Sequence, residues 1–356
     1  MINIQNEPKR SPELFFGESD GVSRIDLPYD SAFKKLAEVD ESNVWFLNLI
    51  SCSQDRWDEM PDNALSKFRK TVGYQTVLDS LVPDVFSYLS EISNDPWLEY
   101  LYSRIATMEH THAMSYSSGV DQAFGAKAQE FLDIIYTDPH IMGRIELELD
   151  LAERFISAVK SGWTDSEEHQ KLLIELLLGV FFLEGIKFPF SFFTSWTLNK
   201  AYDNCAQGFS QLLIKIATDE MSVHTATGST ALRRLSKSTT TAHLFNSGWF
   251  KELATNMAKE TAEREMEWAK YLLEDGAVPG FNQEICNHFI QYWTDRRLKE
   301  LKLEPIYNVQ KNDIEKWFDE YRNINGKASA LQEIDNVSYQ VGQVRNDLSK
   351  FDKKDN

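Results

Sequence analysis

Cysteine, glycine and proline are all scarce in this sequence of 356 residues, and each scarcity excludes some classes of protein fold or site. The three cysteines, Cys52, Cys205 and Cys286, lie far apart and form no CxxC pair. This spacing argues against both a disulfide framework and a thiolate zinc site. With only 16 glycines and 10 prolines, the segments between turns are long, and apolar residues recur in them three and four positions apart. The sequence therefore predicts an all-α protein.

Basic residues and long apolar runs are also in short supply. Lys and Arg total 37 against 55 Asp and Glu, giving a net charge of −18, so a phosphate backbone would be repelled and nucleic acid is not an expected partner. The longest apolar run, Leu172 to Leu183, contains Glu175 and is shorter than the roughly 20 residues that cross a bilayer. The N-terminal residues lack the apolar core of a secretory signal. We expect a cytoplasmic protein that does not bind membranes.

Helical periodicity divides the chain into one long helical region and a short tail. The pattern fades after Asn325, so we expect residues 1–326 to form one helical domain and residues 327–356 to form a flexible tail. Helices are predicted over 29–39, 63–91, 96–120, 121–136, 138–161, 166–183, 185–207, 208–225, 228–236, 247–273, 280–301 and 312–321.

Two segments place a glutamate one helical turn before a histidine. In MEHTHAMSY, Glu109 and His112 are three positions apart, so both side chains share a helix face and can reach one metal ion. Tyr116 follows His112 by four positions on the same face. In IATDEMSVH, Glu220 and His224 are four apart and again share a face.

Two more carboxylates interrupt apolar, helical surroundings. Asp79 lies in YQTVLDSLV and Glu184 in LLLGVFFLEGIKF. A charged carboxylate is costly to bury unless it is paired or bound to metal. Each motif is common by itself on solvated helix faces, as for His110, but their order along four helices rarely arises by chance. The set matches the dinuclear site of ferritin-like bundles and favours iron or manganese: Asp79, Glu109, His112, Glu184, Glu220 and His224.

This order resembles the small subunit of class I ribonucleotide reductase over nearly the whole chain. YQTVLDS, LEGIKFPFSF and EMEWAKYLLEDGAVPGFN support the resemblance, and VSYQVGQVRNDLSKF resembles the end of the family's tail, which binds the large catalytic subunit. The resemblance implies a ferritin-like fold, a homodimer, and a di-iron centre for which manganese is the alternative. It assigns one metal to Asp79, Glu109 and His112 and the other to Glu184, Glu220 and His224.

The resemblance also implies a radical chemistry. Tyr116 would hold a tyrosyl radical, shielded from solvent by apolar side chains for which Phe188, Phe192 and Ile216 are the candidates. Trp45, Asp219 and Tyr339 would relay the radical to the large subunit, where ribonucleotides are reduced to deoxyribonucleotides. Trp45 could equally be one of several buried or surface aromatics.

The second motif departs from the family's usual Glu-x-x-His spacing by one residue. Either the helix contains a one-residue π-bulge, or a regular helical turn brings Glu220 and His224 together. Asp219 is the alternative ligand at this position. Two other readings stay open at this point: a different dinuclear oxidase, such as a desaturase, a ligand-binding oxidase or a ferroxidase, and a metal-free helical scaffold.

Overall fold

The structure is a computed structural model that describes residues 13–17, 21–27, 29–47 and 49–323. Within these ranges the regular structure is helical, apart from one isolated bridge between Val278 and Phe281. The prediction of an all-α protein is confirmed. The α-helices are α1 (Ser31–Ser42), α2 (Asp62–Glu91), α3 (Pro96–Phe124), α4 (Ala128–Leu132), α5 (Ile134–Thr137), α6 (Pro139–Gly162), α7 (Glu167–Phe182), α8 (Phe188–Ala201), α9 (Gln207–Thr218), α10 (Thr225–Leu235), α11 (Ala242–Asn246), α12 (Trp249–Leu272) and α13 (Gln283–Glu300), with a further helical segment over 313–323.

Local sequence explains several helix boundaries. Asp95 accepts hydrogen bonds from the backbone N–H groups of Trp97 and Leu98, and Pro96 occupies the first turn, where a missing N–H costs nothing. Asp138 and Pro139 repeat this arrangement at the start of α6. These caps place the beginnings of two long helices.

Two predictions about helix continuity were wrong. The predicted helix over 121–136 is broken, because α3 ends at Phe124 and Gly125 adopts a φ of 52°, which favours glycine. Conversely, the sequence predicted breaks at Glu184 and at 226–227, but the chain is helical through both positions. Two short π-helices, η3 (Leu183–Lys187) and η4 (Asp219–His224), connect α7 to α8 and α9 to α10 without interruption.

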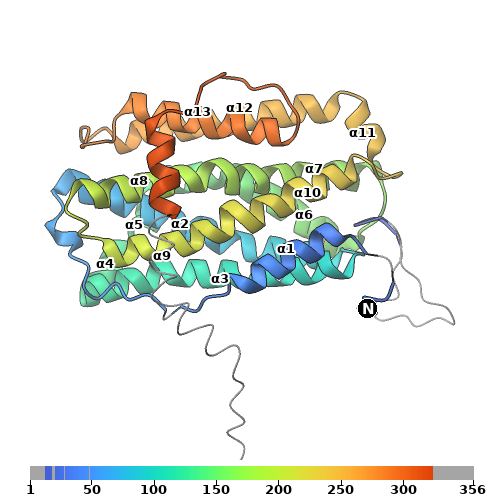
Figure 1. Ribbon diagram of the computed structural model, residues 1–356, viewed down its shortest axis with the longest axis horizontal. Coiled ribbons are helices and arrows are strands. Elements are labelled where there is room, and N and C mark those ends of the chain that lie inside the picture. The colour runs from blue at the N-terminus through green and yellow to red at the C-terminus, as the bar shows by residue number, and fades with distance from the viewer. Residues whose placement is uncertain (1–12, 18–20, 28, 48, 324–356) are drawn as a thin grey trace, which may run out of the picture.

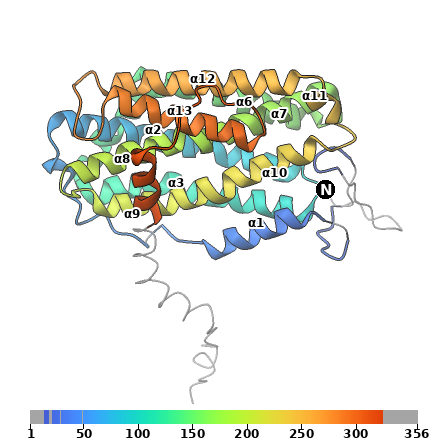
Figure 2. The same ribbon diagram turned by 45° about the horizontal axis from the view of Figure 1, so that its top comes forward.

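Four long helical rods form the centre of the molecule. α2 packs along α3, while α7–η3–α8 and α9–η4–α10 lie against them and meet at the two π-helices. The antiparallel pair α12 and α13 forms a layer on one side, against α7 and η3, and α1 packs on α3 and η4 (Figures 1 and 2). This is the predicted ferritin-like bundle with additional helices.

Candidate metal centre

The two π-helices carry three of the candidate ligands. A π-turn inserts one residue into an α-helix and is frequent at functional sites. Glu184 lies in η3, and Glu220 and His224 lie in η4. Of the two geometries considered for the four-residue spacing, the structure contains the π-helix.

The four rods bring all six predicted ligands into one buried cluster. Asp79 comes from α2, Glu109 and His112 from α3, and the rest from the π-helices; each is at most 2% exposed. Their ligand atoms form two overlapping groups, in each of which all atoms lie within 4.8 Å of one another. One group contains Asp79, Glu109, His112 and Glu220, and the other contains Glu109, Glu184, Glu220 and His224.

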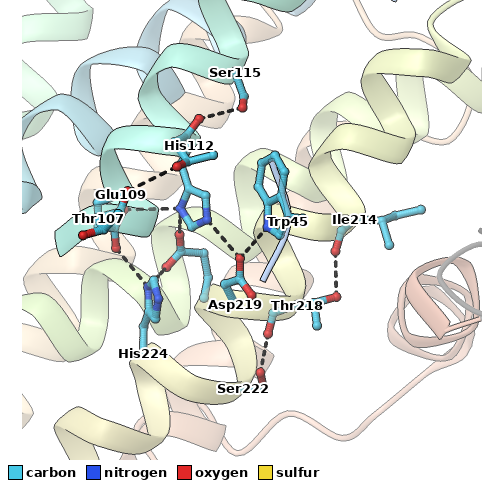
Figure 3. A network of polar contacts seen from close by, with 12 residues as sticks. Trp45, Thr107, Glu109, His112, Ser115, Ile214, Thr218, Asp219, Ser222 and His224 are labelled. Atoms are coloured by element: carbon cyan, nitrogen blue, oxygen red, sulfur yellow. Dashed lines mark hydrogen bonds and ion pairs between the residues drawn. The ribbon is translucent and has the colours of Figure 1, made fainter. Parts of the chain in front are cut away.

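Glu109 and Glu220 belong to both groups, and Glu109 lies beside both imidazoles in Figure 3. His112 Nδ1 is 2.7 Å from Glu220 Oε1 and 3.4 Å from Glu109 Oε2. His224 Nδ1 is 2.9 Å from Glu109 Oε1 and 2.8 Å from Glu220 Oε2. Each imidazole therefore turns the same ring nitrogen toward the same two carboxylates, an arrangement in which both carboxylates could bridge a pair of cations.

Several carboxylate oxygens of this cluster have no hydrogen-bond partner among the described residues. Both carboxylate oxygens of Asp79 and of Glu184 are buried without a hydrogen-bond partner among the described residues. Buried carboxylates without partners are strongly unfavourable, and bound cations are the usual remedy. Four carboxylates and two imidazoles supply the oxygen and nitrogen donors that suit iron or manganese. The residues present thus fit a dinuclear metal centre.

Burial and the close carboxylates shift the pKa values of several cluster residues. Burial, reinforced by neighbouring carboxylates, raises the pKa values of Asp79 and Glu184 well above their usual range. Burial opposes protonation of His112 and His224, but the nearby carboxylates outweigh it and raise both pKa values. Burial also tends to raise the pKa of Glu220, but its contacts with His224, Glu184 and His112 outweigh burial and hold that pKa well below its usual range. The metal-free cluster therefore holds protons that metal ions would displace.

Asp219, the alternative ligand, lies outside both groups of the described cluster. Its Oδ2 accepts a hydrogen bond from Trp45 Nε1 at 2.8 Å and lies 3.1 Å from His112 Nε2. The Trp45 and His112 rings stack with centroids 5.8 Å apart (Figure 3). Asp219 thereby connects Trp45 to the outer nitrogen of His112 and sets the orientation of that imidazole.

Tyr116 lies beside the cluster and is fully buried. Burial first, and then the charge of Asp79, raises its pKa well above the usual range, which keeps the phenol protonated. Its aromatic contact among the described residues is Phe209, with ring centroids 6.2 Å apart. Phe209 was missed in the sequence, where nothing sets it apart from other apolar residues of α9. The three predicted shielding residues, Phe188, Phe192 and Ile216, are all fully buried.

Two cations that the sequence did not single out help to fix η3: Lys187, its last residue, and Arg297, which packs on it. Lys187 is fully buried, 2.7 Å from Glu148 Oε1, and donates to the backbone oxygen of Arg144. On the other side, the Arg297 side chain lies directly on Gly185, the residue after Glu184. These contacts hold the π-turn that presents Glu184. Of the predicted relay residues, Tyr339 lies outside the described part of the chain.

The sequence matches the family described as "Ribonucleotide reductase, small chain" over residues 25–314. The chain belongs to the ribonucleotide reductase small-chain family. Relatives include ribonucleoside-diphosphate reductase 1 subunit beta of Escherichia coli O157:H7, 27% identical over 98% of this chain and 97% of the relative. The corresponding beta subunit of Enterobacteria phage T4 is 26% identical over 98% and 95%.

Solved structures show the same fold. A ribonucleotide reductase R2 subunit from Clostridium botulinum superposes with a TM-score of 0.81 at 20% identity, covering 90% of this chain and 98% of that one. The dimanganese(II)-NrdF of Streptococcus sanguinis gives 0.64 at 20% identity, covering 85% and 98%. The family result supports the resemblance over a desaturase or ferroxidase and makes this chain part of an oxidoreductase. Among the described residues, every helix is too short or too polar to span a lipid bilayer.

Proposed function

We propose that this chain is the radical-generating small subunit of a ribonucleoside-diphosphate reductase. Its buried cluster holds two metal ions, Tyr116 stores the radical, and the large subunit uses that radical to reduce ribonucleotides to deoxyribonucleotides. The observation that carries this proposal is the buried cluster of two overlapping ligand groups beside a buried tyrosine. Family membership supports it independently.

In this proposal Asp79, Glu109 and His112 hold one metal ion, and Glu184, Glu220 and His224 hold the other. Glu109 and Glu220 would be close enough to contribute to both ligand groups. A bound pair of iron or manganese ions, once oxidised by dioxygen or an oxygen-derived oxidant, would supply the one-electron oxidation of Tyr116. Four carboxylates would balance two divalent cations, which suits either element.

The protein's own residues protect and direct the radical. Tyr116 loses an electron and a proton when it is oxidised, and the Asp79 carboxylate, whose charge acts on the Tyr116 phenol, would accept that proton. Complete burial and the contact with Phe209 keep solvent reductants away from the ring. The chain thus contributes ligand geometry, a proton acceptor and exclusion of water.

The path out of the cluster begins with His112, Asp219 and Trp45. The hydrogen bond from Trp45 to Asp219 gives the indole a proton acceptor on the cluster side, which supports its assignment as a relay. We propose that Tyr339, in the tail 327–356, continues this path and that the tail binds the large subunit. We also propose that the small subunit works as a homodimer in the cytoplasm.

The test is low-temperature electron paramagnetic resonance of purified protein loaded with ferrous iron in air, with a parallel manganese sample. We expect a tyrosyl signal in the wild type that is lost in Tyr116→Phe without a change in bound metal. Tyr102→Phe is the matched control, because Tyr102 is a buried tyrosine on the same helix. A signal that persists in Tyr116→Phe would refute the radical assignment. Metal uptake without any radical would favour a dinuclear oxidase, and no metal uptake would reject the centre.

A further inference from the structure

A hollow of about 560 Å³ lies at the end of the bundle where α10 ends and α12 begins, near the position of α11 in Figure 1. Its walls come from four places in the chain: Ala32 in α1, the second half of α10 with the residues after it, the segment from α11 into α12, and the residues after α13. A cavity of this size is typical of sites for small organic molecules. None of its lining residues is a candidate metal ligand.

The charge of this hollow is opposite to that of the chain. Arg233, Arg234, Lys237, Lys251 and Lys302 line it, and no Asp or Glu appears among its described lining residues. Acidic residues outnumber basic ones by 55 to 37 in the whole chain, so an average surface of this protein would present more carboxylates than cations. Five cations and no acidic residue in the lining therefore form a local positive site on an acidic protein.

Four of these cations are available to a ligand. Arg234 is engaged by Asp30, with Nη2 2.9 Å from Oδ1. Arg233 donates only to the hydroxyl of Thr230, at 2.8 Å. Arg233, Lys237, Lys251 and Lys302 have no carboxylate within ion-pair distance in the described part of the chain. Most of the hollow's positive charge is thus not neutralised by the protein itself.

The hollow also has an apolar side. Phe245 is half-buried and its ring centroid is 4.4 Å from that of Phe250, while Leu301 and Leu303 lie alongside in the lining. A ligand that uses the whole site must therefore combine several negative charges with a flat or apolar body. Phosphate groups match Arg and Lys donors through charge-assisted hydrogen bonds.

We propose that this hollow binds an organic polyphosphate, with its phosphates on Arg233, Lys237, Lys251 and Lys302 and its organic part against Phe245. A single carboxylate would leave most of the four cations unneutralised, whereas a triphosphate carries enough charge for all of them. A volume of about 560 Å³ suits a small molecule better than an extended acidic peptide. This site is separate from the metal centre and does not depend on the proposed function.

The test is isothermal titration calorimetry of the metal-free full-length chain with ATP and, separately, with inorganic tripolyphosphate. We expect ATP to bind at one site per chain and more tightly than tripolyphosphate, because only ATP contacts the phenylalanine. The double variant Arg233→Ala, Lys251→Ala should lose at least about tenfold in affinity for both probes, since a charge-assisted hydrogen bond contributes roughly that factor.

Two controls separate a built site from general electrostatics. The double variant Lys127→Ala, Lys200→Ala removes the same charge from exposed positions elsewhere and should bind ATP as the wild type does. Phe245→Ala should weaken ATP binding and leave tripolyphosphate binding unchanged. Absence of ATP binding, equal losses in the two double variants, or equal affinity for both probes would each overturn the proposal, as would binding of an acidic peptide but not of ATP. Circular dichroism melting of every variant verifies that it folds.

Discussion

Gly185 offers a direct test of how the fold presents Glu184. A Cβ atom at this position would lie 2.3 Å from Arg297 Cδ and 2.9 Å from Cγ, far inside van der Waals contact. Arg297 has little room to move, because it is 3% exposed and its Nη1 is 2.9 Å from Glu300 Oε2. Burial also lowers the pKa of Arg297 to about 10, which reflects how poorly solvated this guanidinium is.

Gly185→Ala should therefore destabilise the protein. Overpacking a tight site costs about 1–3 kcal/mol, and replacing a helical glycine by alanine returns up to about 1 kcal/mol. We expect a net loss of about 1–2 kcal/mol in the free energy of unfolding, measured by urea titration of the metal-free protein. Gly143→Ala is the matched control, because Gly143 is also helical and no heavy atom lies within 4 Å of its added Cβ. That substitution should be neutral or stabilising.

A double-mutant cycle identifies the cause. If contact with Arg297 causes the loss, Gly185→Ala should be neutral or stabilising by up to about 1 kcal/mol in an Arg297→Ala background, giving a coupling energy of about 1–3 kcal/mol. Metal uptake provides a second measurement, because Glu184 immediately precedes Gly185 in η3 and should bind less tightly when this turn is displaced. Effects of the two substitutions that add within about 0.5 kcal/mol would refute the reasoning.

Two further predictions concern buried charge. The raised pKa values of Asp79, Glu184 and His224 mean that the folded metal-free protein binds more protons than the unfolded chain above the ordinary pKa of each group, which is 3.8, 4.5 and 6.5 respectively. Its stability should therefore fall as pH rises above these values, by about 1.4 kcal/mol per pH unit for each extra proton. Urea titrations across that range test this, and a flat or rising stability would contradict it. Arg144→Ala should cost about 3–5 kcal/mol, because it leaves the Glu265 carboxylate buried without its partner.

Controls for these two predictions lie elsewhere on the chain or in the metal-loaded form. Bound metal should abolish most of the pH dependence above 6.5, because the ligands are then deprotonated throughout. Arg154→Ala removes an exposed ion pair with Asp150 and should cost no more than about 1 kcal/mol. Equal losses for the buried and the exposed arginine would show that the Glu265 contact contributes little.

Much of the candidate site could be predicted from the chain because helical spacing is local. Glu109 and His112 share a helix face whatever the rest of the protein does. Asp79 and Glu184 lie in apolar helical segments, and a buried carboxylate is costly without a partner. Their neighbours in the sequence are therefore enough to predict that each has one. Helix content followed from periodicity and the scarcity of breakers.

Other features depend on contacts between segments distant in sequence. The sequence left the choice of ligand between Asp219 and Glu220 open, because both residues are acidic and adjacent. In the structure the π-helix η4 turns Glu220 toward the ligand cluster. Trp45, 174 residues before Asp219, holds the Asp219 carboxylate outside the cluster through a hydrogen bond. Nothing in the sequence around Phe209 indicates that its ring lies beside Tyr116.

The sequence by itself determined an all-helical chain with six candidate metal ligands on four helices, because spacing and hydrophobic context act over one or two helical turns. Only the tertiary structure decided that Glu109 and Glu220 lie between both histidines, that Arg297 packs on Gly185, and that unpaired cations gather around one hollow. Each of these depends on which distant segments pack together, and that is decided by the burial of the whole core rather than by any single segment.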